Sequence, residues 1–213
     1  SDACEVAVKW FGNKLNAVAA EVKDHFAKFR ISDALMAVYK FFWDDFCAWY
    51  LELVKPAYGS PIDAKTYEAT LEFFEDLLKM IHPIMPFITE ELWHAVRERG
   101  ENETIMFERY PVAGESDAEY IAAFGLATEV VAGIRNIRQQ KGLSPKEPLK
   151  AYFVGDFSKE MGPVVVKLAN VSEIQHVTTI DESLAGVSFM AGTVKVFVPF
   201  DGLVDATEEI AKL

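Results

Sequence analysis

The chain has 213 residues, a length that suits one large domain or a medium domain with a small companion. Its 51% hydrophobic residues can furnish a packed core, and no apolar stretch reaches the roughly 20 residues of a membrane helix. The net charge of −12 argues against a nucleic-acid partner in general, because phosphate binding rests on Lys and Arg. Any RNA site must therefore be a local patch on an acidic body.

The N-terminus has neither an initiator Met nor a basic segment followed by an apolar block, so we expect no signal peptide. A helical pattern begins within a few residues, which suggests a piece excised from a longer chain. The two cysteines, Cys4 and Cys47, fit buried or incidental thiols in a reducing cytoplasm, and a disulfide between them stays open. We expect a cytoplasmic protein with no membrane partner.

The first 110 or so residues predict long amphipathic helices. From Val8 to Phe29, apolar residues recur at spacings of three and four, which predicts one helix with a single buried stripe. Ser32 is predicted to cap a second helix that runs to Lys55, where Pro56 ends it. This second helix is aromatic around most of its circumference, so we expect it at the centre of a bundle.

Two further helices complete the predicted bundle. Ser60 as N-cap, with a proline next to it in the first turn, starts a helix that ends at His82. Thr89 is predicted to cap a fourth helix, because two carboxylates follow it where a helix N-terminus favours negative charge. That helix is expected to run to Gly100.

After a loop over 101–116 the hydrophobic period changes. A helix is predicted over about 117–141, and another over 159–170. Short β-branched, alternating segments predict strands at 151–154, 172–180, 187–190 and 193–200. The predicted fold is mainly α: an antiparallel helical bundle over 1–116, followed by a small α+β subdomain over 117–213.

One face of the first helix carries the main candidate for RNA binding. At about 100° per residue, Lys9, Asn13 and Lys14 fall with Trp10 away from the apolar stripe. An exposed indole among amines and amides can stack an unpaired RNA base, which is worth about 1–3 kcal/mol. The alternative is that Trp10 packs against another domain or a loop.

The strongest concentration of basic residues lies in the run over 134–149. Arg135, Arg138 and Lys141 are candidates for phosphate contacts, and the two arginines lie on neighbouring turns of one helix. The alternative is that the arginines cap helix ends or pair with acidic residues such as Glu129.

No constellation predicts covalent chemistry or a metal site. Glu91 with His94 and Glu173 with His176 each match the Glu-x-x-His element of di-iron bundles, but the second pair lies in a predicted strand, so the symmetric helical site cannot be built. The cysteines lack zinc-ligand spacing, and nucleophile-elbow, phosphate-loop and zinc-protease motifs are absent. We expect no catalytic residue, no metal and no cofactor in this chain.

Four segments resemble one family of proteins. The segment HPIMPFITEELW, residues 82–93, resembles the anticodon-binding domains of the class I aminoacyl-tRNA synthetases for valine, leucine and isoleucine. The valyl members in particular are similar to FFWDDFCAWYLELVKP (41–56), IRNIRQQKGLSP (134–145) and FVPFDGLVD (197–205). The resemblance spans nearly the whole chain.

The resemblance implies a tRNA anticodon-binding fragment of a valyl-tRNA synthetase, whose parent enzyme uses ATP and magnesium to attach valine to tRNA(Val). It implies as partners the anticodon stem-loop of tRNA(Val) and the catalytic and editing domains of the parent chain, with no DNA. The HIGH and KMSKS motifs of the family's catalytic fold do not occur in the 213 residues, and a coiled-coil arm would begin near Leu213. The fragment is therefore expected to be no enzyme by itself.

The resemblance also favours Trp10 as the stacking platform, with Lys9, Asn13 and Lys14 as supporting contacts. Two alternatives stay open. One is a helical protein-interaction module without RNA binding. The other is the equivalent domain of an isoleucyl- or leucyl-tRNA synthetase.

Overall fold

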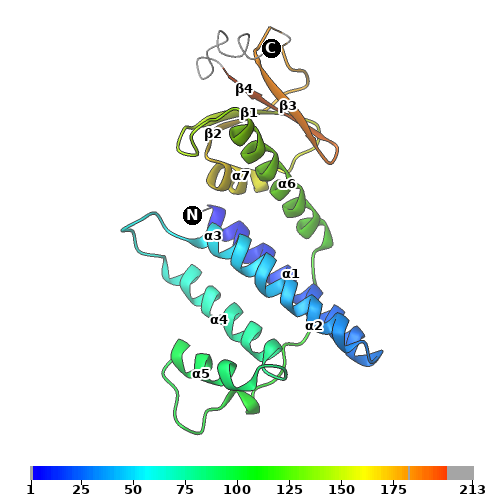
Figure 1. Cartoon of the computed structure of the whole chain (residues 1–213), viewed down its shortest axis with the longest axis vertical. Coiled ribbons are helices and arrows are strands. Elements are labelled where there is room, and N and C mark those ends of the chain that lie inside the picture. The colour runs from blue at the N-terminus through cyan, green and yellow to red at the C-terminus, as the bar shows by residue number, and fades with distance from the viewer. Residues whose placement is uncertain (1, 182, 201–213) are drawn as a thin grey trace. The chain divides into compact units, whose positions relative to one another are not determined.

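The chain folds as two compact units in its computed structural model, which describes residues 2–181 and 183–200. Unit 1 comprises Ala3–Ala118, and unit 2 begins at Glu119; the sequence placed the boundary after residue 116. Unit 1 is helical, whereas unit 2 combines helices with a sheet, so the predicted mainly α fold with a small α+β subdomain is confirmed (Figure 1). The predicted start of a coiled-coil arm near Leu213 lies outside the described residues.

Unit 1 contains three long helical segments and two short ones. The first two long segments are α1 (Asp2–Ala27) and a continuous helix made of α2 (Ile31–Lys40), the π-helix η1 (Phe41–Tyr50) and α3 (Leu51–Val54). They are followed by α4 (Ala64–Ile81), α5 (Pro86–Val96) and the 3-10 turn η2 (Ile105–Phe107). Pro56 follows the end of the second segment, as predicted, because proline cannot continue a helix.

The core of unit 1 is a cluster of aromatic rings around Phe11, which is fully buried. Its ring stacks on Phe41 at 4.6 Å between centroids and meets Tyr50 and Phe73 at 4.9 Å each. Such ring pairs add about 0.5–1.5 kcal/mol each beyond the area that they bury. The aromatic second helix therefore supplies the bundle core, as its composition predicted.

All three predicted helix caps are wrong. Ser32 lies inside α2, which begins at Ile31. The helix α4 begins at Ala64, and its N-cap is Asp63 rather than Ser60, because the Asp63 carboxylate accepts the Thr66 N–H at 2.9 Å. Hydrogen bonds from the backbone and the side chain of Thr66 hold the pKa of Asp63 below its usual value, since they stabilise the ionised form.

Thr89 does not cap the fourth helix either. The helix α5 begins three residues earlier, at Pro86, and Thr89 is buried inside its first turns. The Thr89 hydroxyl donates to the Met85 carbonyl at 2.8 Å and shares a hydrogen bond of 2.7 Å with His82 Nδ1. These bonds fix the turn between α4 and α5 from its inner side.

Unit 2 packs α6 (Ala118–Gln140) and a short helix against a four-stranded sheet. The elements after α6 are β1 (Leu149–Val154), η3 (Lys159–Met161), α7 (Gly162–Ala169), β2 (Val171–His176), β3 (Gly186–Ala191) and β4 (Val194–Pro199). The strand order is β2-β1-β4-β3; β1 runs parallel to β2, and the other neighbours are antiparallel. The predicted helices and strands of this part are therefore confirmed.

The helix α6 lies on the sheet through a face that includes Val130, Ile134 and Ile137, all buried. Gly133 on this helix faces the Phe189 ring, and a Cβ built on Gly133 would lie only 2.0 Å from Phe189 Cε2. Any larger residue at this position would force the Phe189 ring to move from its place against the helix. Among the described residues, no helix is long and apolar enough to cross a membrane.

Candidate nucleic-acid interface

The structure places Trp10 differently from the sequence prediction. Its side chain is 3% exposed, and its ring meets Phe11 edge-on at 5.8 Å between centroids. Trp10 belongs to a second buried line along α1 together with Ala3 and Ala7. The expectation that this indole stands outside the hydrophobic core is therefore wrong, because its ring is covered in the folded chain and leaves no face for a base.

The side-chain amide of Asn13, which was expected to support Trp10, hydrogen-bonds the chain's own backbone. Asn13 Nδ2 donates to the Lys9 carbonyl at 2.9 Å, and Asn13 Oδ1 accepts the Asp117 N–H at 2.7 Å. One turn later, Asn16 accepts the Gly114 N–H at 3.1 Å and donates to the Glu115 carbonyl at 2.9 Å. The polar face of α1 thus holds the segment 114–117, and Asn13 is not available to RNA in this arrangement.

Lys14 pairs with an acidic residue of the second helix. Its Nζ lies 3.5 Å from the Asp45 carboxylate, and the two side chains are 31% and 20% exposed. Burial raises the pKa of Asp45, and Lys14 partly opposes that rise. Lys14 is therefore engaged with the second helical segment, whereas Lys9 is exposed on α1.

The basic run of α6 is mainly structural. Arg138 is 5% exposed, and its guanidinium donates to the carbonyls of Ser144 at 2.8 Å and of Ala169 and Asn170 at 3.0 Å each. Burial lowers the pKa of Arg138, because a charged group loses its hydration there. The alternative that the arginines cap a helix end is therefore correct for Arg138, since two of these carbonyls end α7.

Arg135 and Lys141 are more accessible than Arg138. Arg135 is exposed, and its Nε and Nη2 donate to the Leu168 carbonyl at 3.1 and 2.9 Å. Lys141 is half-buried, and its Nζ lies 5.8 Å from the centre of the Phe200 ring. The four predicted contacts on α1 belong to unit 1, whereas these three belong to unit 2.

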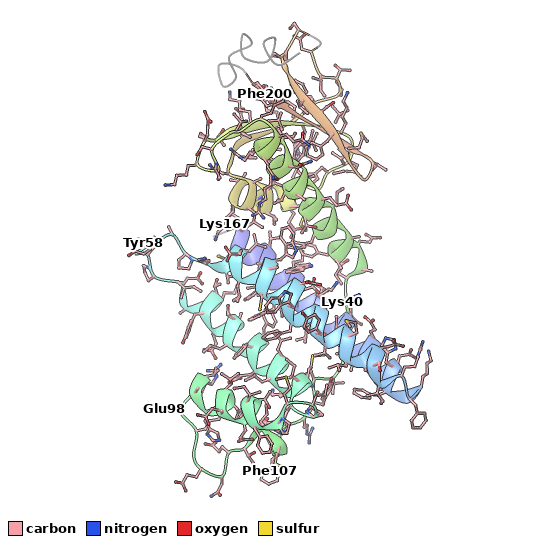
Figure 2. All side chains as sticks on the ribbon, in the orientation of Figure 1. Lys40, Tyr58, Glu98, Phe107, Lys167 and Phe200 are labelled. Carbon is pink, nitrogen blue, oxygen red and sulfur yellow. The ribbon has the colours of Figure 1, made fainter. Side chains whose placement is uncertain are left out.

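Two exposed aromatic rings that the sequence prediction missed lie on the second helical segment. Tyr39 and Trp43 are 55% and 59% exposed, and their rings are parallel within 6° at 6.4 Å between centroids. They are four residues apart, where η1 begins; a π-helix turns less per residue than an α-helix, which brings the two side chains nearly into line. Lys40, which follows Tyr39 in the sequence, is exposed and has no ion pair in the described part of the chain; Figure 2 labels it.

The sequence contained a signal for this pair. Aromatics occupy positions 39, 41, 42, 43, 46, 49 and 50, so they cannot all face one core. Tyr39 and Trp43 lie one turn apart on one line, while Phe41 and Phe46 lie on the buried side. A search for the aromatic pair opposite the buried side would have selected them.

The described residues offer no metal centre. Among them, no group of three or more His, Cys, Asp or Glu side chains is close enough together to hold a metal ion. His94 hydrogen-bonds Glu90 at 3.1 Å on its own helix, and His176 lies in β2, far from helical geometry. Cys4 and Cys47 are free thiols, so the disulfide that stayed open is not formed.

Comparison with known families decides the class of this interface. Residues 8–153 match the family model described as the anticodon-binding domain of tRNA ligase, which covers most of unit 1 and extends to β1. The chain belongs to this family. This anticodon-binding domain is thus an RNA-binding module by family, on a fold whose net charge alone argued the other way.

Three relatives of this anticodon-binding domain are valine–tRNA ligases. That of Parabacteroides distasonis is 47% identical over 213 residues, which is 100% of this chain and 24% of the ligase. Those of Porphyromonas gingivalis and Phocaeicola vulgatus are each 46% identical, over 100% and 98% of this chain and 24% of each ligase. The chain therefore spans about a quarter of the length of these relatives, and the alternative of a leucyl or isoleucyl domain is not favoured.

Proposed function

We propose that this anticodon-binding domain binds the anticodon stem-loop of tRNA(Val) as one part of a cytoplasmic valine–tRNA ligase. The family match over residues 8–153 carries the proposal, and the names of the three relatives supply valine as the amino acid. The domain contributes recognition without chemistry. Attachment of valine with ATP and magnesium, and any editing, belong to the rest of the ligase, whose catalytic and editing domains are its partners.

The parallel rings of Tyr39 and Trp43 support a contact with unpaired bases of the anticodon loop. Both rings are more than half exposed, so a base can cover them without disturbing the core. Stacking of a base on an aromatic side chain is worth about 1–3 kcal/mol and tolerates any base, because every base has a π-face. Lys40 beside the rings supplies a cation for the adjoining phosphate.

Of the basic residues expected from the sequence, three stay proposed as phosphate contacts. Lys9 and Arg135 are exposed, and Lys141 is half-buried. Trp10, Asn13, Lys14 and Arg138 are not proposed as contacts, because each is buried or holds another part of the chain. With few cations on an acidic domain, the salt slope should be shallow, about −0.7 in log–log form per phosphate contact on single-stranded RNA.

A titration of the chain with the tRNA(Val) anticodon stem-loop, and with a stem-loop of altered anticodon, tests the proposal. We expect tighter binding of the valine anticodon. Trp43→Ala and Tyr39→Ala should each weaken that binding by about 5- to 150-fold, which corresponds to 1–3 kcal/mol. Lys40→Ala should make the salt slope shallower by about 0.7.

The matched control is Tyr58→Ala. Tyr58 is a fully exposed tyrosine on the loop between α3 and α4, whereas Lys40 marks the position of the ring pair on the second helical segment (Figure 2). Tyr58→Ala should change neither the affinity for the stem-loop nor the stability of the chain. Equal affinity for both stem-loops would rule out anticodon recognition by this chain, and an equal loss in Tyr58→Ala and Trp43→Ala would rule out the ring pair.

A further inference from the structure

Unit 1 turns a group of large apolar side chains outward at the α4–α5 turn and at η2. We call this group the outer patch. It consists of Ile84 (45% exposed), Met85 (52%), Phe87 (91%), Ile88 (47%), Met106 (71%) and Phe107 (82%). Soluble monomers rarely expose contiguous apolar patches larger than a few hundred Å², and those that do use them for binding.

The α4–α5 turn holds the first four of these side chains outward by placing its polar atoms inward. The bond between His82 and Thr89 spans the turn, and Thr89 is 2% exposed. The N–H groups of Ile84 and Met85 both donate to the Ile81 carbonyl, at 2.9 and 3.1 Å. The turn is therefore well fixed, so the exposure of its apolar side chains is a property of the folded unit.

The turn η2 adds its two side chains to the same surface. Thr104 Oγ1 donates to the Glu90 carboxylate at 2.6 Å, which ties η2 to the beginning of α5. Ile105 packs inward on Leu78 and Trp93, which leaves Met106 and Phe107 facing outward. Figure 2 shows Phe107 projecting from the part of unit 1 that contains α5.

Charges around the outer patch disfavour RNA as its partner. Glu91, Glu103 and Glu108 are exposed and close to it in the sequence, and Arg109 is the one Lys or Arg in residues 82–91 and 103–109. Phosphates would be repelled there. Exposed Phe and Met side chains are instead typical of the centre of protein–protein interfaces.

We infer that the outer patch is the surface on which another domain of the longer valine–tRNA ligase docks. The inference rests on the proposed function, because that function supplies the longer ligase. The relatives match this chain over its whole length with 24% of their own, so about three-quarters of each lies outside the match and can provide the apolar partner surface. The docking would hold the anticodon-binding domain against the part of the ligase that reacts.

The methionines of the chain provide a test that needs no substitution in the patch. Met85 and Met106 belong to the outer patch, Met190 is 62% exposed on β3, and Met80 and Met161 are 2% and 1% exposed. The chain alone and a Parabacteroides distasonis valine–tRNA ligase whose matching quarter is replaced by this chain are treated with hydrogen peroxide. Sulfoxide at each methionine is then followed by mass spectrometry.

We expect Met85 and Met106 to oxidise readily in the chain alone and slowly in the chimeric ligase. Burial of Met85 from 52% exposed to the 2% of Met80 reduces its accessible area by more than tenfold, and its oxidation rate should fall similarly. Met190 should react at the same rate in both proteins. Met80 and Met161 should stay unreactive in both, which reports that the chimera is folded.

Three results would overturn the inference. They are equal oxidation of Met85 and Met106 in both proteins, protection of these residues by the anticodon stem-loop alone, and protection that depends on the concentration of the chain alone. The last two would assign the patch to RNA or to a second copy. If the full replacement does not fold, the replacement of residues 3–118 alone repeats the comparison.

A pair of variants separates this inference from the proposed function. Phe87→Asp in the chimera should slow the attachment of valine to tRNA(Val), whereas Phe29→Asp, at a side chain that is 88% exposed outside the patch, should not. A chain that binds the stem-loop while its patch stays reactive in the ligase would leave the proposed function intact and refute the docking. Protection of the patch in the chimera, combined with no contribution of this domain to stem-loop binding, would support the docking and refute the proposed function.

Discussion

Arg138 offers the sharpest test of the difference between an RNA contact and a structural cation. Its guanidinium is almost completely buried in unit 2 and donates to three carbonyls, those of Ser144, Ala169 and Asn170. Arg138→Met keeps the apolar stem and removes all three donors. Hydrogen bonds to a charged group contribute about 1.5–3 kcal/mol each, but the variant also avoids the cost of burying the charge.

We expect a net loss of about 3 kcal/mol or more, because three carbonyls lose their donor at about 1–3 kcal/mol each, and the avoided burial of the charge offsets only part of this. For a unit of this size, each kcal/mol lowers the thermal midpoint by about 4–8 °C, so a decrease of at least about 12 °C is expected. Circular dichroism on heating gives the midpoint. Hydrogen exchange at the β1 and β2 amides assigns the loss to unit 2, since the two units need not unfold together.

Arg135→Met is the matched control. Arg135 is exposed and donates to a single carbonyl, that of Leu168, so its loss should cost about 1 kcal/mol or less. If Arg138→Met instead unfolds within about 4 °C of the unmodified chain and binds the anticodon stem-loop more weakly, the structural assignment of Arg138 is refuted.

Two further substitutions test the helical unit. Trp10→Ala should lower the free energy of unfolding by about 3–5 kcal/mol in a urea titration, because it removes a buried aromatic side chain. An unchanged urea midpoint would show that Trp10 is not part of the core. Asp45→Asn should raise the free energy of unfolding at pH 7 more than at pH 3. Burial raises the pKa of Asp45 above the ordinary value of an aspartic acid, so the stabilising contribution of its neutral form is complete below that ordinary value and is lost as the pH rises through the raised pKa. An equal effect of Asp45→Asn at both pH values would contradict the raised pKa. The ion pair with Lys14 favours the ionised carboxylate and so reduces the expected difference between the two pH values.

Periodicity predicted most of the fold because each long helix of unit 1 buries a continuous stripe. The bounds were less predictable. The start of α4 depends on which of Ser60 and Asp63 accepts a backbone N–H, and both are good N-cap residues. The π-helix η1 was not predicted at all, since its residues satisfy the α-helical pattern equally well.

The error at Trp10 has a physical cause. A helical wheel gives the angle of a side chain but not the number of faces that the fold covers, and α1 is buried on two. Phe11 and Leu15 lie on one face, while Ala3, Ala7 and Trp10 lie on the other. Two alanines at spacings of three and four from a tryptophan are the signal that was available, because small residues permit close approach at a second face.

The role of Arg138 was beyond sequence reasoning for a different reason. Its acceptors at Ala169 and Asn170 lie about 30 residues further along the chain and reach it only through the tertiary fold. From sequence, capping and phosphate binding were equally consistent with the same two arginines. Burial of one arginine and exposure of the other resolved what spacing could not.

The attachment of residues 114–117 to α1 determines where the protein can be divided. Asn13 and Asn16 accept hydrogen bonds from the two ends of this segment, from the N–H groups of Asp117 and Gly114 respectively. Cutting after residue 116, where the sequence suggested a border, would separate Asp117 from its acceptor. A helical fragment intended for isotope labelling or crystallisation should end at Ala118, so that it retains the hydrogen bond between the Asp117 N–H and Asn13 of α1.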